Sequence, residues 1–104
     1  QNGCLVFHFT GQLDAYSEKQ FMEYVVDVLK ASKLPAVIDL SKIDFLDSSG
    51  LGALVQLAKQ CTDAKRAFSL VGNSRVMQTV KLVRLEEFLH LAQDLPSALS
   101  NLAA

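Results

Sequence analysis

Ala36-Val-Ile-Asp-Leu-Ser-Lys-Ile-Asp-Phe-Leu-Asp-Ser-Ser-Gly-Leu-Gly52 is the stretch that decides the fold. Its first five residues, Ala36–Leu40, are nearly all apolar, which predicts a short strand buried at the centre of a sheet and covered by helices. Ser41–Leu46 is expected to be a loop. Asp47-Ser-Ser-Gly50 then begins a helix, because apolar residues follow at helical spacing and mark its buried side: Leu51, Leu54, Val55, Ala58 and Cys61. A strand that leads through a loop into an amphipathic helix is the repeating unit of an α/β fold.

The same unit precedes this stretch. Leu5–Thr10 alternates between two faces and predicts a strand that ends at Gly11. His8 falls on the face opposite the phenylalanines, where a half-exposed position is expected. Ser17–Gln20 has the spacing of a capping box and predicts the start of a helix that ends near Ala31.

Two further units follow it. Ala67–Val71 predicts a third strand, and Ser74 is expected to cap a third helix. Phe88–Leu91 is expected to form the last strand, and Asp94–Leu102 the last helix. The order β-α-β-α-β-α-β-α predicts an α/β fold with a small, mostly parallel or mixed sheet. With 104 residues, the chain 1–104 fits a single domain.

Composition excludes several classes of function. The formal net charge of −1 provides no basic excess for direct contact with a nucleic acid. No apolar run approaches the roughly 20 residues that insertion into a membrane requires. Cys4 and Cys61 lie far apart and belong to no CxxC pair, so we expect small core residues in a cytoplasmic protein.

No catalytic or cofactor motif stands out. Gly50-Leu-Gly52 is not a dinucleotide fingerprint, and the sequence has no phosphate-binding GxxxxGK[ST] loop. Asp44 and Asp47 are close enough to suggest a metal site, but carboxylates before a helix are usually caps or solvated charges. We therefore expect no enzymatic activity, no cofactor and no bound metal.

The Asp47–Gly50 segment carries the main functional hypothesis. Asp47 is expected to cap the helix by accepting hydrogen bonds from free N–H groups of the first turn. Ser48 and Ser49 place two hydroxyls at the same helix start. A phosphate there would add about 1.5 to 2 negative charges next to a favourable helix end, without melting the helix. Such a site suits a reversible switch, although capping serines are also common without one.

Three segments resemble a known family. Phe45-Leu-Asp-Ser-Ser-Gly-Leu-Gly52 looks like the phosphorylation motif of the STAS-domain anti-sigma factor antagonists. Thr10-Gly-Gln-Leu-Asp14 resembles the G-x-L-D segment of that family, and Val37-Ile-Asp-Leu-Ser41 resembles the strand that precedes its phosphorylation site. The three segments agree in order and spacing, and the resemblance covers nearly the whole chain.

The resemblance implies a function and a site. In that family the second serine of the motif is phosphorylated, which is Ser49 here, and the surface around it binds an anti-sigma factor that is often a serine kinase. Asp14, Asp47 and Ser48 would then contribute to partner binding and kinase recognition. Phosphorylation blocks binding, a serine phosphatase resets the switch, and transcription is regulated indirectly. The implied fold has helices mainly on one face of the sheet.

Two departures and two alternatives accompany this interpretation. Family members usually have a further edge strand before the segment that begins at Cys4, so here that strand is absent or truncated and the free edge could support an oligomer. Arg84-Leu-Glu86 stands where the family often has a glycine.

One alternative function is that of a STAS accessory subunit or domain of a lipid or anion transport system without a phosphoswitch. The other is a small enzyme or nucleotide-binding protein that uses the Asp47–Gly50 loop.

Overall fold

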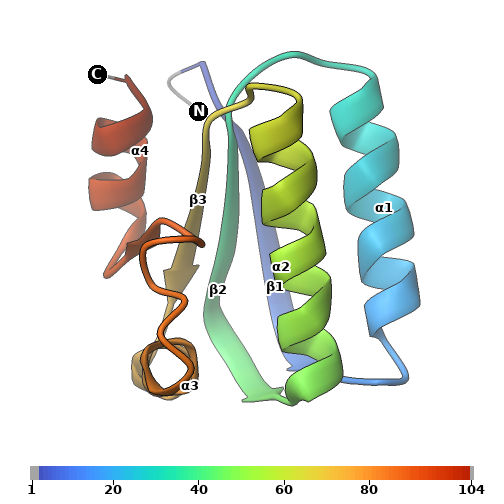
Figure 1. Cartoon of the computed structure of the whole chain (residues 1–104), viewed down its shortest axis with the longest axis vertical. Coiled ribbons are helices and arrows are strands. Elements are labelled where there is room, and N and C mark those ends of the chain that lie inside the picture. The colour runs from blue at the N-terminus through green and yellow to red at the C-terminus, as the bar shows by residue number, and fades with distance from the viewer. Residues whose placement is uncertain (1–2, 104) are drawn as a thin grey trace.

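The structure is a computed structural model that describes residues 3–103, so residues 1, 2 and 104 of the expected domain lie outside it. Its elements alternate between strand and helix as the sequence predicts, and the four strands form one parallel sheet in the order β1-β2-β3-β4 (Figure 1). The elements are β1 (Leu5–Leu13), α1 (Glu18–Lys30), β2 (Ala36–Leu46), α2 (Ser48–Asp63), β3 (Phe68–Gly72), α3 (Ser74–Leu82), β4 (Leu91–Ala92) and α4 (Leu95–Ala103).

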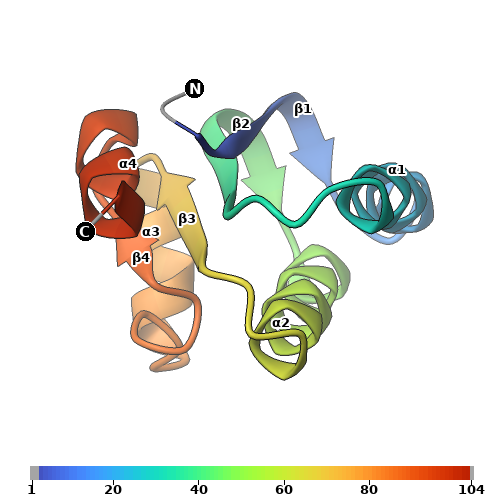
Figure 2. The ribbon, with the colours of Figure 1, turned by 90° about the horizontal axis from the view of Figure 1, so that it is seen from above.

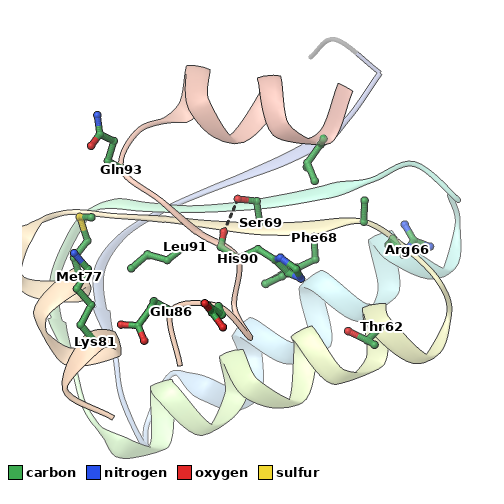
Figure 3. A pocket seen from close by; sticks show the side chains of 13 residues that line it. Thr62, Arg66, Phe68, Ser69, Met77, Lys81, Glu86, His90, Leu91 and Gln93 are labelled. Carbon is green, nitrogen blue, oxygen red and sulfur yellow. Dashed lines mark hydrogen bonds between the residues drawn. The ribbon is translucent and has the colours of Figure 1, made fainter. Parts of the chain in front are cut away.

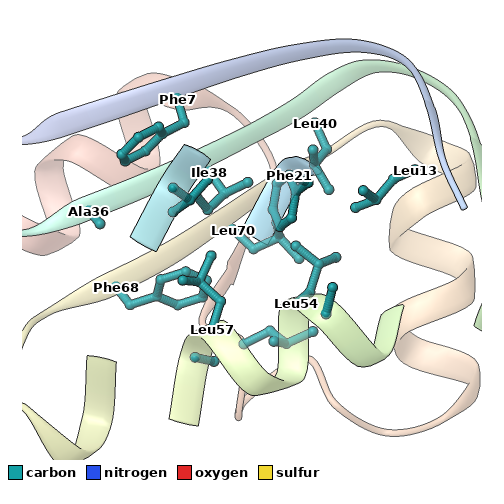
Figure 4. Close-up of a cluster of buried hydrophobic side chains, with 14 of the residues drawn as sticks. Phe7, Leu13, Phe21, Ala36, Ile38, Leu40, Leu54, Leu57, Phe68 and Leu70 are labelled. Atoms are coloured by element: carbon teal, nitrogen blue, oxygen red, sulfur yellow. The ribbon is translucent and has the colours of Figure 1, made fainter. Parts of the chain in front are cut away.

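The helices lie mainly on one face of the sheet. The larger core packs one face of the strands against α1, α2 and α3, with Ile38, Leu54 and Leu70 fully buried (Figure 4). A smaller core on the opposite face packs α4 against β2, β3 and β4 (Figure 2). Cys61 is buried in the first core and Cys4 in the second, so both cysteines occupy core positions as predicted.

The first two strands are longer than the sequence pattern indicates. Ser41–Leu46, expected to be a loop, continues β2, and β1 continues past Gly11 to Leu13. Two register shifts between β1 and β2 bend the pair, and Gly11 has a φ of +85° that suits glycine. These irregularities hide the alternation of a regular strand from sequence analysis, and they let Ile43 and Leu46 turn into the core.

α1 begins after Ser17 as predicted, but two predicted caps and the bounds of the last strand were wrong. The side chain of Ser17 does not cap α1, because its hydroxyl donates to the carbonyl of Gln12 instead. Asn73, rather than Ser74, caps α3 by accepting a hydrogen bond from Val76 N–H. The last strand is Leu91–Ala92, whereas Phe88–His90 form a turn with a positive φ of 50° at His90, whose carbonyl accepts hydrogen bonds from Leu70 N–H and the hydroxyl of Ser69 on β3.

A polar pair occupies the sheet face opposite the larger core. Asp39 of β2 is 9% exposed, and its Oδ2 lies 2.8 Å from Nδ1 of His8 on β1. Burial alone would raise the pKa of Asp39, but hydrogen bonds from Ser41 and the contact with His8 together lower that pKa below its ordinary value of 3.8. His8 itself is largely exposed, as the sequence suggests.

Asp39→Asn should therefore destabilise the fold in a pH-dependent way. A carboxyl group whose pKa is lower in the folded state stabilises the protein above its unfolded pKa of 3.8, and that contribution is lost as the pH falls through the folded value. We expect the variant to lose about 1–2 kcal/mol in the free energy of unfolding at pH 7 and much less at pH 3. Urea unfolding at both pH values measures this, with the exposed Asp63→Asn as control. A loss of equal size at both pH values would contradict the assignment.

Candidate functional site

The segment after β1 and the start of α2 meet at the carboxyl edge of the sheet, and the carboxylate of Asp47 joins them. Its Oδ1 accepts a hydrogen bond from Gly50 N–H at 2.9 Å, which caps α2 as the sequence predicts. Its Oδ2 accepts a second bond from Ala15 N–H at 3.2 Å, in the connection between β1 and α1. One side chain therefore fixes the start of α2 relative to the neighbouring loop.

Gly50 allows these two segments to come so close. A Cβ atom at this position would lie 2.3 Å from the carbonyl oxygen of Leu13, well inside any real contact. The main-chain N–H of Asp47 also donates to that oxygen, at 3.3 Å. The last residue of β1 thus packs directly against the first turn of α2, and only glycine fits between them.

Asp14 builds the turn that leads into α1. Its Oδ1 accepts hydrogen bonds from the N–H groups of Tyr16, at 3.0 Å, and Ser17, at 3.1 Å. Its own N–H donates to the hydroxyl of Ser17 at 3.0 Å. Asp14 therefore stabilises the turn at the entry to α1. This turn lies beside Asp47, because Ala15, a residue of the turn, donates its N–H to the carboxylate of Asp47.

Ser48 and Ser49 are the first two residues of α2. Ser48 is exposed and Ser49 is half-buried. Neither hydroxyl takes part in a hydrogen bond within residues 3–103, because Asp47 already caps the helix. No residue within the first turn of α2 is acidic, but the carboxylate of Asp47 already lies at this positive helix end, so an added anion would meet both the favourable dipole and a negative charge.

Two aromatic side chains flank this edge, and sequence analysis did not find them. Tyr16 is 95% exposed in the Asp14 turn, and Phe45 is 44% exposed near the end of β2, where it pairs with Gln12. Because Ser41–Leu46 was expected to be a loop, no alternation was available to indicate that Phe45 points outward. Exposed aromatic residues beside a polar site are typical of protein interfaces.

A wider hollow lies elsewhere, lined by residues from the end of α2, from α3 and from β4 (Figure 3). It measures about 880 Å³ and carries charges of both signs, among them Lys81 and Glu86. Arg66 also lines it, and the guanidinium group of Arg66 donates hydrogen bonds to the main-chain oxygens of Leu29, Ser32 and Leu34. In this hollow the hydroxyl of Ser69 donates to the main-chain carbonyl of His90 and not to its imidazole (Figure 3), and residues 3–103 contain no cluster of acidic, histidine or cysteine side chains that could hold a metal.

The model of the STAS domain family matches residues 1–98 of the sequence. The chain belongs to the STAS domain family. Within residues 3–103, no helix combines the length and the apolar character needed to cross a bilayer.

Solved structures of two kinds share this fold. An anti-sigma factor antagonist from Mycobacterium paratuberculosis is 25% identical, with a TM-score of 0.81 over 100% of this chain and 89% of that protein. A sulfate transporter family protein from Wolinella succinogenes is 17% identical, with a TM-score of 0.79 over 95% and 84%. The anti-sigma factor antagonist SpoIIAA, in its unphosphorylated form, is 17% identical, with a TM-score of 0.72 over 90% and 84%. The fold alone therefore does not separate regulators from transport proteins.

Removing the carboxylate of Asp47 should destabilise α2 and loosen its contact with the Asp14 turn. We expect Asp47→Ala to lose about 0.5–2 kcal/mol in the free energy of unfolding, the usual cost of a lost cap. Hydrogen exchange at the amides of Ala15 and Gly50 should accelerate. Asp44→Ala is the matched control, because Asp44 is exposed and its side chain makes no hydrogen bond within the described residues. Equal stability of the two variants would refute the capping role.

The two glycines of α2 should respond in opposite ways to alanine. Gly50→Ala forces a methyl group against the main chain of Leu13 and should cost about 1–3 kcal/mol. Gly52→Ala meets no atom within 4 Å and should gain about 0.5–1 kcal/mol from helix propensity. Urea unfolding of both variants measures this difference. A Gly50→Ala variant as stable as the unmodified protein would show that the close contact is not a constraint.

Proposed function

We propose that this chain is an anti-sigma factor antagonist in which phosphorylation of Ser49 controls binding to an anti-sigma factor. One observation carries the proposal: the carboxylate of Asp47 holds the start of α2 against the neighbouring loop while the hydroxyl of Ser49 takes no part in a hydrogen bond within the described structure. Ser49 can be modified without loss of any bond that maintains the fold. The similarity to two anti-sigma factor antagonists supports the same conclusion.

The partner-binding surface in this proposal is the edge that contains Asp14, Asp47, Ser48 and Ser49. Ser48 is exposed and Ser49 partly so, and Asp47 connects them to the Asp14 turn. Tyr16 and Phe45 add apolar contact area on either side. Tyrosine is among the residue types that most often dominate the affinity of a protein interface, and an exposed phenylalanine adds apolar area that binding can bury.

Phosphorylation would change the charge of this surface far more than its shape. A phosphate adds about 1.5 to 2 negative charges to an edge that already carries the carboxylates of Asp14 and Asp47. The dipole at the amino end of α2 offsets part of the repulsion from Asp47, and the phosphate replaces no bond of the helix start, so the fold should be preserved. Inside an interface, however, an uncompensated charge costs about 2–5 kcal/mol, which corresponds to about a 30-fold to several-thousand-fold loss of affinity.

This chain is then a binding regulator and not an enzyme. Its partners in the proposal are a cytoplasmic anti-sigma factor with serine kinase activity and a serine phosphatase that restores the unphosphorylated form. It would act on transcription indirectly, without touching nucleic acid. The free edge of β1 is the place where an oligomer could form in this proposal, since β1 is the first strand in the sheet order.

Phosphorylation should map to Ser49 and abolish tight binding. After incubation with the cognate kinase, Ser49→Ala should remain unlabelled, and the matched variant Ser48→Ala should be labelled. Calorimetric titration of the anti-sigma factor should show at least a 30-fold weaker affinity for the phosphorylated protein. Phe45→Ala should weaken binding of the unphosphorylated protein, because it removes an exposed aromatic side chain from the interface.

Circular dichroism of both forms provides the control for folding. Equal affinities of the phosphorylated and unphosphorylated proteins, both folded, would exclude the switch. That result would favour a second function, an accessory subunit or domain of a lipid or anion transport system. The similarity to a sulfate transporter family protein is the observation behind this second candidate. If subunits of a transport system bind Ser49→Asp as tightly as the unmodified protein, that result would support the second function.

A further inference from the structure

A second opening lies between β1 and α1, about 240 Å³ in volume. Its floor is formed by buried residues of the larger core, among them Leu13, Phe21 and Leu40, which lie next to one another at one end of the cluster (Figure 4). Phe9 and Tyr24 also line the opening; the ring of Phe9 lies 4.8 Å from that of Phe21 and packs edge-to-face against that of Tyr24, with the ring centres 6.3 Å apart. Tyr24 is nevertheless 58% exposed, so apolar surface next to the opening remains in contact with solvent.

The lining of this opening contains no charged side chain. Charged residues make up 20% of the chain, yet all ten lining residues are apolar or neutral polar: Phe9, Thr10, Gln12, Leu13, Ser17, Gln20, Phe21, Tyr24, Leu40 and Ile43. The larger hollow near α3 differs in this respect, because Arg66, Lys81, Glu86 and Glu87 all line it. A charged ligand would lose its hydration in the smaller opening and find no opposite charge.

The polar side-chain groups of the lining belong to Thr10, Gln12, Ser17, Gln20 and Tyr24, and the buried floor is apolar. Water deep in the opening would therefore find few hydrogen-bond partners, although the volume corresponds to about eight water molecules. An apolar cavity of about 150 Å³ accommodates benzene. A volume of 240 Å³ suits a somewhat larger molecule, with about ten non-hydrogen atoms.

We propose that the opening between β1 and α1 binds a small, uncharged, mainly aromatic molecule with one hydrogen-bonding group that stays at the rim. The aromatic side chains of the lining, Phe9, Phe21 and Tyr24, favour an aromatic ring, and the exposed side chains of Gln12 and Gln20 can accept or donate a hydrogen bond at the mouth. The proposal does not depend on phosphorylation of Ser49, since no lining residue belongs to α2.

Titration with indole, followed by two-dimensional amide NMR of the unmodified chain, tests the proposal. We expect saturable shifts at the amides of Phe9, Gln12 and Phe21, with a dissociation constant of about 10 μM to 1 mM for a molecule of this size. Indole-3-carboxylate, which has a similar ring but a negative charge, should bind at least ten-fold more weakly.

Two matched tryptophan variants of α1 show where the probe binds. Gln20→Trp covers the mouth of the opening and should weaken indole binding at least ten-fold, whereas Lys19→Trp, one residue away, exposed and outside the lining, should not change it. Circular dichroism shows that both variants are folded. The proposal fails if indole causes no saturable shift, if the shifts lie around Phe68 and His90, or if both variants bind equally. It also fails if the same amides shift with protein concentration alone, which would indicate a second copy of the chain in the opening.

Discussion

The carbonyl oxygen of Leu13 and the first turn of α2 approach each other so closely that a Cβ atom on Gly50 would lie 2.3 Å from that oxygen. This contact brings the end of β1 next to the start of α2, and the carboxylate of Asp47 then reaches both Gly50 and Ala15. A larger side chain at position 50 would separate the two segments. The Asp14 turn would then lose its bond to Asp47, and the edge of the sheet would no longer present one continuous surface.

This arrangement separates the residues that maintain the fold from those that remain available for chemistry. Asp47 caps α2 with one carboxylate oxygen and binds the neighbouring loop with the other. Ser48 and Ser49 stand beside it at the helix start, where serine is itself a common cap, yet neither hydroxyl is used within the described structure. Because the capping role belongs to a residue outside the serine pair, a modification of either serine leaves the bonds of the helix start in place.

Sequence reasoning predicted the order of the elements and the central role of Asp47, but not the irregular parts of the sheet. The nearly continuous apolar sequence of Ala36–Leu40 identified it as a buried strand, because a strand that is covered on both faces needs apolar residues at almost every position. The register shifts between β1 and β2 depend on pairing across the sheet and leave no periodic signal, so Ser41–Leu46 was mistaken for a loop and Phe45 was missed. The cap of Asp47 follows from residue type, whereas its bond to Ala15 joins positions 32 residues apart and needs the assembled fold.

The parallel order β1-β2-β3-β4 also has a consequence for how the chain folds. His8 and Asp39, which pair across β1 and β2, are separated by 31 residues, so no part of the sheet can begin as a local hairpin. Each pairing must first close a long loop, which predicts slower folding than in a helical bundle of the same size. Each strand does, however, join the one synthesised just before it. The sheet can therefore grow from β1 onward while the chain leaves the ribosome at about 5–20 residues per second, and every new strand meets an edge that already exists.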